Sequence, residues 1–203
     1  MELELSPIRG YIEVLVLDKE GRVVQQGRHP MRSFLNNFLK FFEAFSKSDG
    51  VSITDTGGTA RTIYGSGVGY QSRLGGLAPD NDDSYGILVG SGTTPVDLTQ
   101  IRLASKITHG TATGQLDYDA VSVDDLGLDT SVTPPVYRFR LCRTFKNLST
   151  ASVTITEVGI AVRTRQGGDD LRFLISRDLL PTSYTVPAGG SAAVIVTVEV
   201  EMG

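Results

Sequence analysis

The chain has 203 residues, a length typical of one domain. Hydrophobic residues make up 40% of it and charged residues 21%, which allows a real core and argues against disorder. A net charge of -4 supplies no concentrated positive charge for phosphates, so we expect no specific nucleic-acid partner. The single cysteine, Cys142, excludes an intrachain disulfide framework, and its position in an apolar strand pattern is typical of a buried free thiol.

The sequence shows no targeting or membrane signal. The N-terminus lacks a basic segment followed by an apolar run, so no signal peptide is expected. No apolar stretch approaches the roughly 20 residues needed to span a bilayer. We therefore expect a soluble protein that is made in a reducing cytoplasm and has no membrane partner.

Residues 1–30 predict an N-terminal β-hairpin. Apolar β-rich runs over residues 11–17 and 22–26 form its two strands. The turn between them, Asp18 to Gly21, ends in a glycine that can adopt positive φ.

Residues 31–49 predict the one convincing helix, over about residues 33–46, with Ser33 as its N-cap. Phenylalanine recurs there at helical spacing on a wide apolar stripe. The stripe consists of Phe34, Phe38, Phe41, Phe42 and Phe45, together with Leu35 and Leu39. It either packs against this protein's own sheet, or part of it docks a neighbouring subunit, which makes the five phenylalanines candidate interface residues.

Residues 50–85 predict a glycine-rich arm or loop insertion. Apolar residues are scattered through it, and a structureless loop of this length is unusual inside a compact domain. We expect an ordered arm that contacts a neighbour, with Tyr64 and Tyr70 as candidate interface residues.

Residues 86–203 predict the body of the fold, in one domain with residues 1–49. Short β-rich runs alternate with turn signals, while 124–135 is read as an acidic loop closed by prolines. The predicted strands are 86–90, 106–110, 114–118, 136–145, 153–164, 171–176 and 193–202. The predicted fold class is mainly β, an antiparallel β-sandwich of jelly-roll-like type with one amphipathic helix.

The runs 136–145 and 153–164 are expected to form a hairpin at the centre of a sheet. Tyr137, Phe139 and Leu141 alternate with Arg138 and Arg140, which is the period of a half-buried strand. The second run changes parity, which predicts a bulge near residues 157–159. Arg138 and Arg140 belong either to a solvated face with cross-strand acids or to an inter-subunit contact.

Candidate chemistry is incomplete in every segment that suggests it. The glycine-rich stretches lack the glycine-lysine-hydroxyl ending of a phosphate loop, and Asp80 to Asp82 begins a calcium loop without its glycine and closing glutamate. His29 and His109 have no metal-ligand spacing, and no serine lies in a Gly-x-Ser-x-Gly elbow. We therefore expect no enzyme activity, no metal and no cofactor.

Three segments resemble parts of tailed-bacteriophage virion proteins of unassigned role. They are residues 86–110, residues 143–160, and the run from Ser176 through the turn at 186–190 to the last valine-rich strand. The likeness covers about half the chain, mainly residues 86–200, and consists of strand-and-turn patterns rather than catalytic residues.

That resemblance implies a structural component of a phage particle, located in the virion. Its partners would be other copies of itself and other virion proteins. A tail or head-to-tail component is favoured over a capsid decoration protein. The alternative is a receptor- or carbohydrate-binding module on the same fold, which needs exposed loop aromatics such as Tyr64, Tyr70 and Tyr85.

Overall fold

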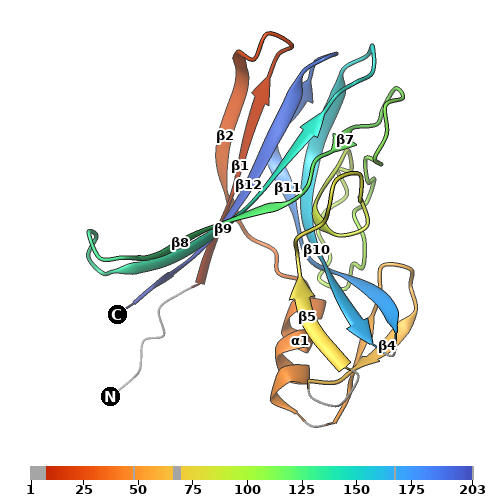
Figure 1. Ribbon diagram of the computed structural model, residues 1–203, viewed down its shortest axis with the longest axis vertical. Helices are drawn as coiled ribbons and strands as arrows, with labels where there is room; N and C mark the ends of the chain where they lie inside the picture. Colours follow the sequence, from red (N-terminus) through yellow and green to blue (C-terminus); the bar gives the residue numbers. More distant parts are fainter. Residues whose placement is uncertain (1–7, 48, 66–69, 167, 203) are drawn as a thin grey trace.

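The computed structural model describes residues 8–47, 49–65, 70–166 and 168–202 (Figure 1). Two antiparallel sheets dominate it, with one helix among the described residues, so the predicted β-sandwich-like class is confirmed. No helix in these ranges is long and apolar enough to cross a membrane.

The larger sheet has six strands in the order β2-β1-β12-β9-β7, and β8 pairs with β9 as well. Its strands are β1 (Ile8–Leu17), β2 (Val23–Met31), β7 (Asp117–Tyr118), β8 (Ser122–Asp129), β9 (Val136–Lys146) and β12 (Ser191–Glu201). The β1–β2 turn places Gly21 at φ 78°, and the predicted N-terminal hairpin is present as one side of this sheet.

The second sheet has four strands in the order β11-β10-β5, and β6 also pairs with β10. They are β5 (Tyr70–Gly75), β6 (Gly86–Gly90), β10 (Val153–Gln166) and β11 (Asp169–Val186). The core lies between the two sheets, where alternate side chains such as Val14, Val194 and Phe145 from the first meet Ile155 and Phe173 from the second.

The predicted central hairpin of 136–145 and 153–164 is wrong, because β9 and β10 belong to different sheets. β9 pairs with β12, and β10 pairs with β11. The intervening residues carry the chain from one layer to the other, and buried Asn147 holds them by donating to the carbonyls of Ala151, Val186 and Pro187 at 2.8–3.1 Å. Alternation identified the strands, but it contains no information about which strand is the partner.

The predicted bulge in the second run is confirmed. The β10–β11 register shifts between Ile155 and Glu157 and again between Ile160 and Ala161. Residues 157–162 are all buried, because they contribute to the core and the 91–105 loop, whose N–H groups at Gly92 and Ser105 donate to Glu157, lies against the strand.

The helix α1 (Asn36–Ser46) begins three residues later than expected, and Ser33 is not its N-cap. Leu35 occupies the cap position and makes no side-chain cap hydrogen bond. The preceding residues are held extended by β11: Phe34 bridges Ser176, and Leu35 N–H donates to the Ile175 carbonyl at 2.9 Å. This tertiary pairing overrides the local preference for an earlier helix start.

Asp178 also holds this linker, at an energetic cost. Its Oδ1 accepts from the Arg32 N–H at 2.7 Å, whereas its buried Oδ2 has no hydrogen-bond partner. Burial raises the pKa of Asp178 above its usual 3.8, against the opposing effect of the Arg32 and Ser33 donors. Because its folded-state pKa lies above its unfolded-state pKa, protonated Asp178 contributes to the free energy of unfolding in full below the unfolded-state pKa. This contribution is lost as the pH rises through the folded-state pKa.

We expect Asp178→Asn to raise the free energy of unfolding at pH 7 by about 1 kcal/mol, because it removes a buried unpaired charge and keeps the acceptor for Arg32. The advantage should shrink to nothing as the pH falls towards 3.8. Urea unfolding from acid to neutral pH measures it, with the exposed Asp169→Asn as control. A gain that is constant with pH would contradict this account.

The expected glycine-rich arm over 50–85 contains three short strands that pack on the body. β3 (Val51–Thr54) and β4 (Ala60–Ile63) form a hairpin beside α1, with Ile53 and Ile63 buried. β5 joins the four-stranded sheet by pairing with β10. The β3–β4 hairpin and β5 are thus ordered by this chain's own contacts; contact with a neighbour stays a prediction.

The predicted acidic loop 124–135 is wrong in its first half, where β8 runs antiparallel to β9. Aspartate and glycine have low strand propensity, but pairing with β9 decides the outcome. A register shift between Asp125 and Gly127, with Gly127 at φ 63°, accommodates the glycine.

Candidate assembly surfaces

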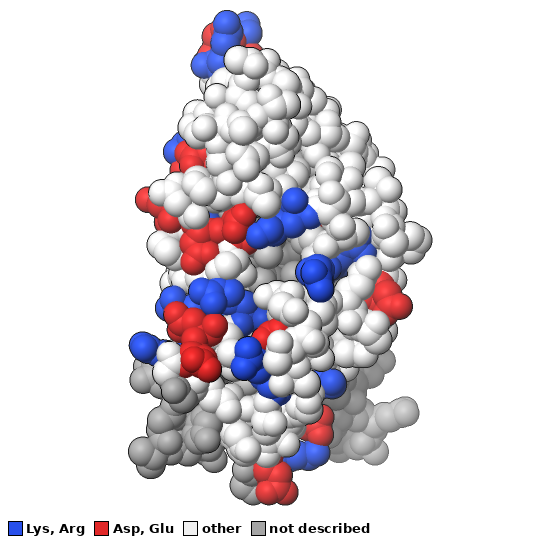
Figure 2. Space-filling model, turned by 90° about the vertical axis from the view of Figure 1, so that its right-hand side faces the viewer, with Lys and Arg blue, Asp and Glu red and all other residues white. Residues whose placement is uncertain are grey.

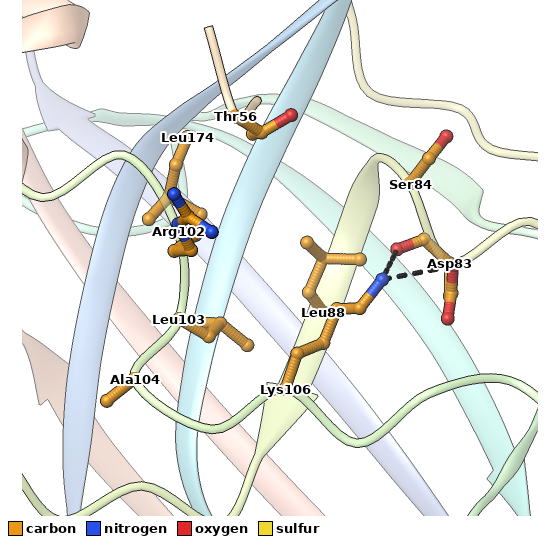
Figure 3. Close-up of a pocket in the computed structure, with 9 residues that line it drawn as sticks. All are labelled: Thr56, Asp83, Ser84, Leu88, Arg102, Leu103, Ala104, Lys106 and Leu174. Atoms are coloured by element: carbon orange, nitrogen blue, oxygen red, sulfur yellow. Dashed lines mark hydrogen bonds and ion pairs between the residues drawn. The ribbon is translucent and has the colours of Figure 1, made fainter. Parts of the chain in front are cut away.

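A hollow of about 380 Å³ lies where the 102–106 segment crosses the four-stranded sheet (Figure 3). Leu88, Leu103 and Leu174 contribute apolar surface to its lining. Lys106 at its rim is neutralised by Asp83, with Nζ and Oδ1 3.1 Å apart. The hollow is thus a partly apolar site in which Lys106 is already paired, while Arg102 also contributes to the lining.

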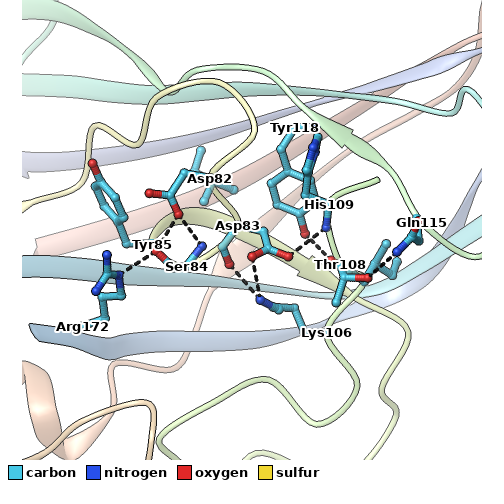
Figure 4. Close-up of polar contacts among 12 residues, drawn as sticks. Asp82, Asp83, Ser84, Tyr85, Lys106, Thr108, His109, Gln115, Tyr118 and Arg172 are labelled. Atoms are coloured by element: carbon cyan, nitrogen blue, oxygen red, sulfur yellow. Dashed lines mark hydrogen bonds and ion pairs between the residues drawn. The ribbon is translucent and has the colours of Figure 1, made fainter. Parts of the chain in front are cut away.

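Beside this hollow, a polar network joins residues 82–85 to residues 106–118 (Figure 4). The Ser84 hydroxyl donates to Asp82 at 2.5 Å and accepts from Arg172 Nε at 2.6 Å, so its one donor is used. Nδ1 of the His109 ring accepts from the backbone N–H of Tyr118 at 3.3 Å. The backbone N–H of His109 donates to Oδ2 of Asp83 at 2.8 Å.

The electrostatics of the network favour a structural role. Burial alone would raise the pKa of Asp83, but the His109 N–H and the Lys106 ammonium outweigh it and lower that pKa. The carboxylate is therefore held ionised as an acceptor for the 106–109 segment, and not poised for proton transfer near neutral pH.

The phenylalanine stripe of α1 divides into two faces. Phe41 is fully buried against Phe173, with ring centroids 5.3 Å apart, and Phe34 and Phe38 are half-buried and pack against the core. Phe42 and Phe45 face solvent, as does the neighbouring Leu39. We call Leu39, Phe42 and Phe45 the helix patch; their exposed fractions are 41–66%, far above those of core residues.

Arg138 and Arg140 lie half-buried on the outer face of the six-stranded sheet, among cross-strand acids. Arg138 pairs with Asp129 at 3.0 Å and with Glu199 at 3.3 Å, and Arg140 pairs with Asp124 at 3.4 Å. Of the two readings that the sequence left open, the structure contains the contacts of the first, a solvated face with paired charges.

The three candidate tyrosines are not brought together as exposed loop aromatics. Tyr85 is buried, with the Arg163 guanidinium 5.0 Å from its ring centroid, and Tyr64 is half-buried. Tyr70 lies in β5, but its side chain is outside the described part of the structure.

Cys142 is half-buried, and not fully buried as its sequence pattern suggested. It lies on the same outer face, with Sγ 3.9 Å from Asp124. Burial and the neighbouring carboxylate raise the pKa of the thiol, which disfavours the reactive thiolate.

In Figure 2, charges of both signs lie side by side across the middle and lower parts of the face, and a large uncharged area separates them from a small charged cluster at the top. This view shows no broad surface of one sign. In the residues that the structure describes, no group of three or more His, Cys, Asp or Glu side chains could hold a metal ion.

One exposed apolar surface escaped the sequence analysis. It consists of Ile8, Val123, Leu128, Tyr137 and Phe139, at the end of the six-stranded sheet where β8 and β9 project beyond the sandwich (Figure 1). Alternation in 136–145 placed the two aromatics on one face, but predicted that this face would be covered.

Comparison with protein-family models, with curated proteins and with solved structures found no match to this chain in any of the three.

Proposed function

We propose that this chain is a structural component of a tailed-bacteriophage particle. It is made in the host cytoplasm and assembles into the virion in multiple copies through protein–protein contacts, in the tail or head-to-tail region. The observation that carries the assembly role is the helix patch, three large apolar side chains exposed on a firmly anchored helix. The strand-and-turn likeness of residues 86–200 to virion proteins directs the proposal to a phage particle.

The anchoring of α1 supports docking. Phe41 and Ala44 bury the inner face of the helix, and buried Asn37 donates to the carbonyls of Thr54 and Leu174, both at 3.2 Å. Because the helix is held on that side, its outer side chains are presented in fixed positions, which lowers the entropy cost of association. Capsid decoration is the alternative within the same proposal.

The test is particle incorporation. The cells are infected with a version of the encoding phage from which the gene for this chain has been deleted. We expect a tagged wild-type chain, expressed from the host, to co-sediment with the purified particles. The Leu39→Ser/Phe42→Ser double variant should be depleted from particles at least about tenfold, since two apolar anchors of roughly 1 kcal/mol or more are lost. Its free energy of unfolding should change by less than about 1 kcal/mol, because both side chains are already exposed.

Leu77→Ser is the matched control, since Leu77 is 53% exposed outside the helix patch. It should enter particles like the wild type. Infectious particles that form without the chain, while the tagged wild type stays at the top of the gradient, would refute the proposed function. Incorporation into heads alone would favour capsid decoration.

A further inference from the structure

The six-stranded sheet carries an apolar row on its inner face at the end that projects from the sandwich. In register, Ile8 is opposite Val200, Val200 is opposite Tyr137, and Tyr137 is opposite Leu128. Residues directly opposite on antiparallel strands point to the same face, so the row crosses β1, β12, β9 and β8 without a charged residue. A second row continues it through Val198 and Phe139 and ends opposite Asp125 of β8, the one charged position that the register places on this face.

This row lies on the face that the sandwich buries elsewhere. Alternate residues of a strand share a face, so Ile8 lies on the same face of β1 as the core residues Ile12, Val14 and Val16. Val200 lies likewise on the same face of β12 as Val196 and Val194. In Figure 1, β8 and the ends of β9 and β12 project to the lower left, whereas α1, β4 and β5 lie to the lower right. The four-stranded sheet therefore does not cover this end, and we call it the overhanging face.

The exposed area of the overhanging face is large enough for a specific contact. Ile8, Val123, Leu128, Tyr137 and Phe139 are each 36–56% exposed. At about 200 Å² for a fully exposed large apolar residue, they leave on the order of 500 Å² uncovered. Two copies that cover each other would bury about 1,000 Å² from these residues alone, which reaches the lower bound for a biological interface.

The two sides of this end differ in charge. Its outer face carries ion pairs among Arg138, Arg140, Asp124, Asp129 and Glu199. The inner row has no charge, and the register places one acid, Asp125, in the row beside it, opposite Phe139. A largely apolar face of this kind packs on an identical copy across a two-fold axis, as an isologous contact requires.

We propose that two copies of this chain dimerise by packing their overhanging faces against each other. Each sheet end then supplies the covering layer that the other lacks, at the usual spacing of about 10 Å between packed sheets. The dimer deepens the proposed function by naming one contact of the assembly, but it can be tested on the purified chain alone.

Sedimentation equilibrium of the full chain over a range of concentrations tests the dimer. We expect a monomer–dimer equilibrium that is not weakened between about 0.1 M and about 0.5 M salt, because no pair of opposite charges is formed across the contact. Leu128→Glu should weaken the dimer at least about 100-fold, since it removes two buried leucines and buries two carboxylates per dimer. Leu148→Glu is the control, because Leu148 and Leu128 are both 54% exposed and Leu148 lies in the turn after β9.

Both variants should keep the wild-type circular dichroism spectrum and urea midpoint. A monomer at every concentration would overturn the dimer, as would equal effects of Leu128→Glu and Leu148→Glu. A dimer lost in Leu39→Ser/Phe42→Ser but not in Leu128→Glu would assign the contact to the helix patch and refute this one. If the purified chain does not dimerise, the prediction that it enters particles is unaffected. If it dimerises but is absent from particles, this contact is upheld and the proposed function is refuted.

Discussion

Replacing Glu157 with glutamine is expected to lower the free energy of unfolding by about 3–5 kcal/mol. Glu157 and Arg177 form an ion pair with no solvent exposure on either side chain, with Oε2 and Nε 2.5 Å apart. Without the carboxylate, the guanidinium of Arg177 stays buried and uncompensated. For a domain with a total stability of about 5–15 kcal/mol, this is a large fraction.

The carboxylate also holds the loop that follows β6. It accepts from the N–H groups of Gly92 at 3.2 Å, Ala104 at 3.2 Å and Ser105 at 2.8 Å. Arg177 donates to Gln100 at 2.8 Å and to the Thr94 carbonyl at 2.9 Å. One ion pair therefore attaches both ends of the 91–105 loop to β10 and β11.

Urea unfolding at pH 7 measures the effect. The exposed Glu43→Gln, which removes the partner of Lys47, should cost less than about 0.5 kcal/mol. In the Glu157→Gln/Arg177→Met double variant the loss should be smaller than the sum of the single losses, because no buried charge remains. A loss below 1 kcal/mol for Glu157→Gln would show that water reaches Arg177, and would contradict the buried pair.

Arg143→Met is expected to destabilise the fold by about 3–4 kcal/mol, through unsatisfied carbonyls. The guanidinium of Arg143 is buried in the core and has no carboxylate partner among the described residues. It donates instead to five backbone carbonyls at 2.6–3.4 Å, which belong to Pro79, Asp82, Tyr85, Ile87 and Asp119. Its cation also lies 4.6 Å from the centroid of the Tyr118 ring.

Arg143→Lys should recover only part of this loss, since an ammonium has three donors and no planar fork. Burial lowers the pKa of Arg143 itself, and the same burial should lower the folded-state pKa of a lysine there. A cation whose folded-state pKa lies below its unfolded value gains stability as the pH rises between the two. Relative to wild type, we therefore expect the lysine variant to be more stable at pH 9 than at pH 7 by about 1 kcal/mol.

Urea midpoints of wild type, Arg143→Met and Arg143→Lys at the two pH values check both statements. Arg163→Met is a control, because that guanidinium is exposed. Equal stability of the methionine variant and wild type would mean that the five carbonyls find other donors.

Strand positions were largely predictable, because alternation with period two reflects burial of one face. The runs at 11–17, 86–90 and 193–202 are strands in the structure, and the turn at 186–190 contains Gly189 at φ 74°. Arg143 and Glu157 broke this pattern and were not recognised as buried hubs. Arg143 contacts main-chain carbonyls, and Glu157 contacts main-chain N–H groups and the Arg177 side chain; all of these partners are distant in sequence and leave no local signal.

Of the candidate interface residues, sequence spacing grouped Phe34, Phe38, Phe41, Phe42 and Phe45 on one broad stripe, but Phe34 precedes the helix and the others divide between a covered and an exposed face. Spacing could not say which part of the stripe the body would cover, since that depends on where β3 and β11 lie against α1. The overhanging face was missed for the same reason. Tyr137 and Phe139 have the alternation of core residues, and only the limited extent of the opposing sheet leaves them exposed.

By itself, the sequence determined the β-rich class, most strand positions, the existence of the helix and the bulge in β10, because these depend on local propensity and on burial of alternate side chains. The tertiary structure decided that β9 and β10 lie in different sheets, that β8 is a strand, and which apolar side chains remain exposed. Those outcomes depend on pairing and packing between segments far apart in the chain, whose free energy exceeds the local preferences of the residues involved.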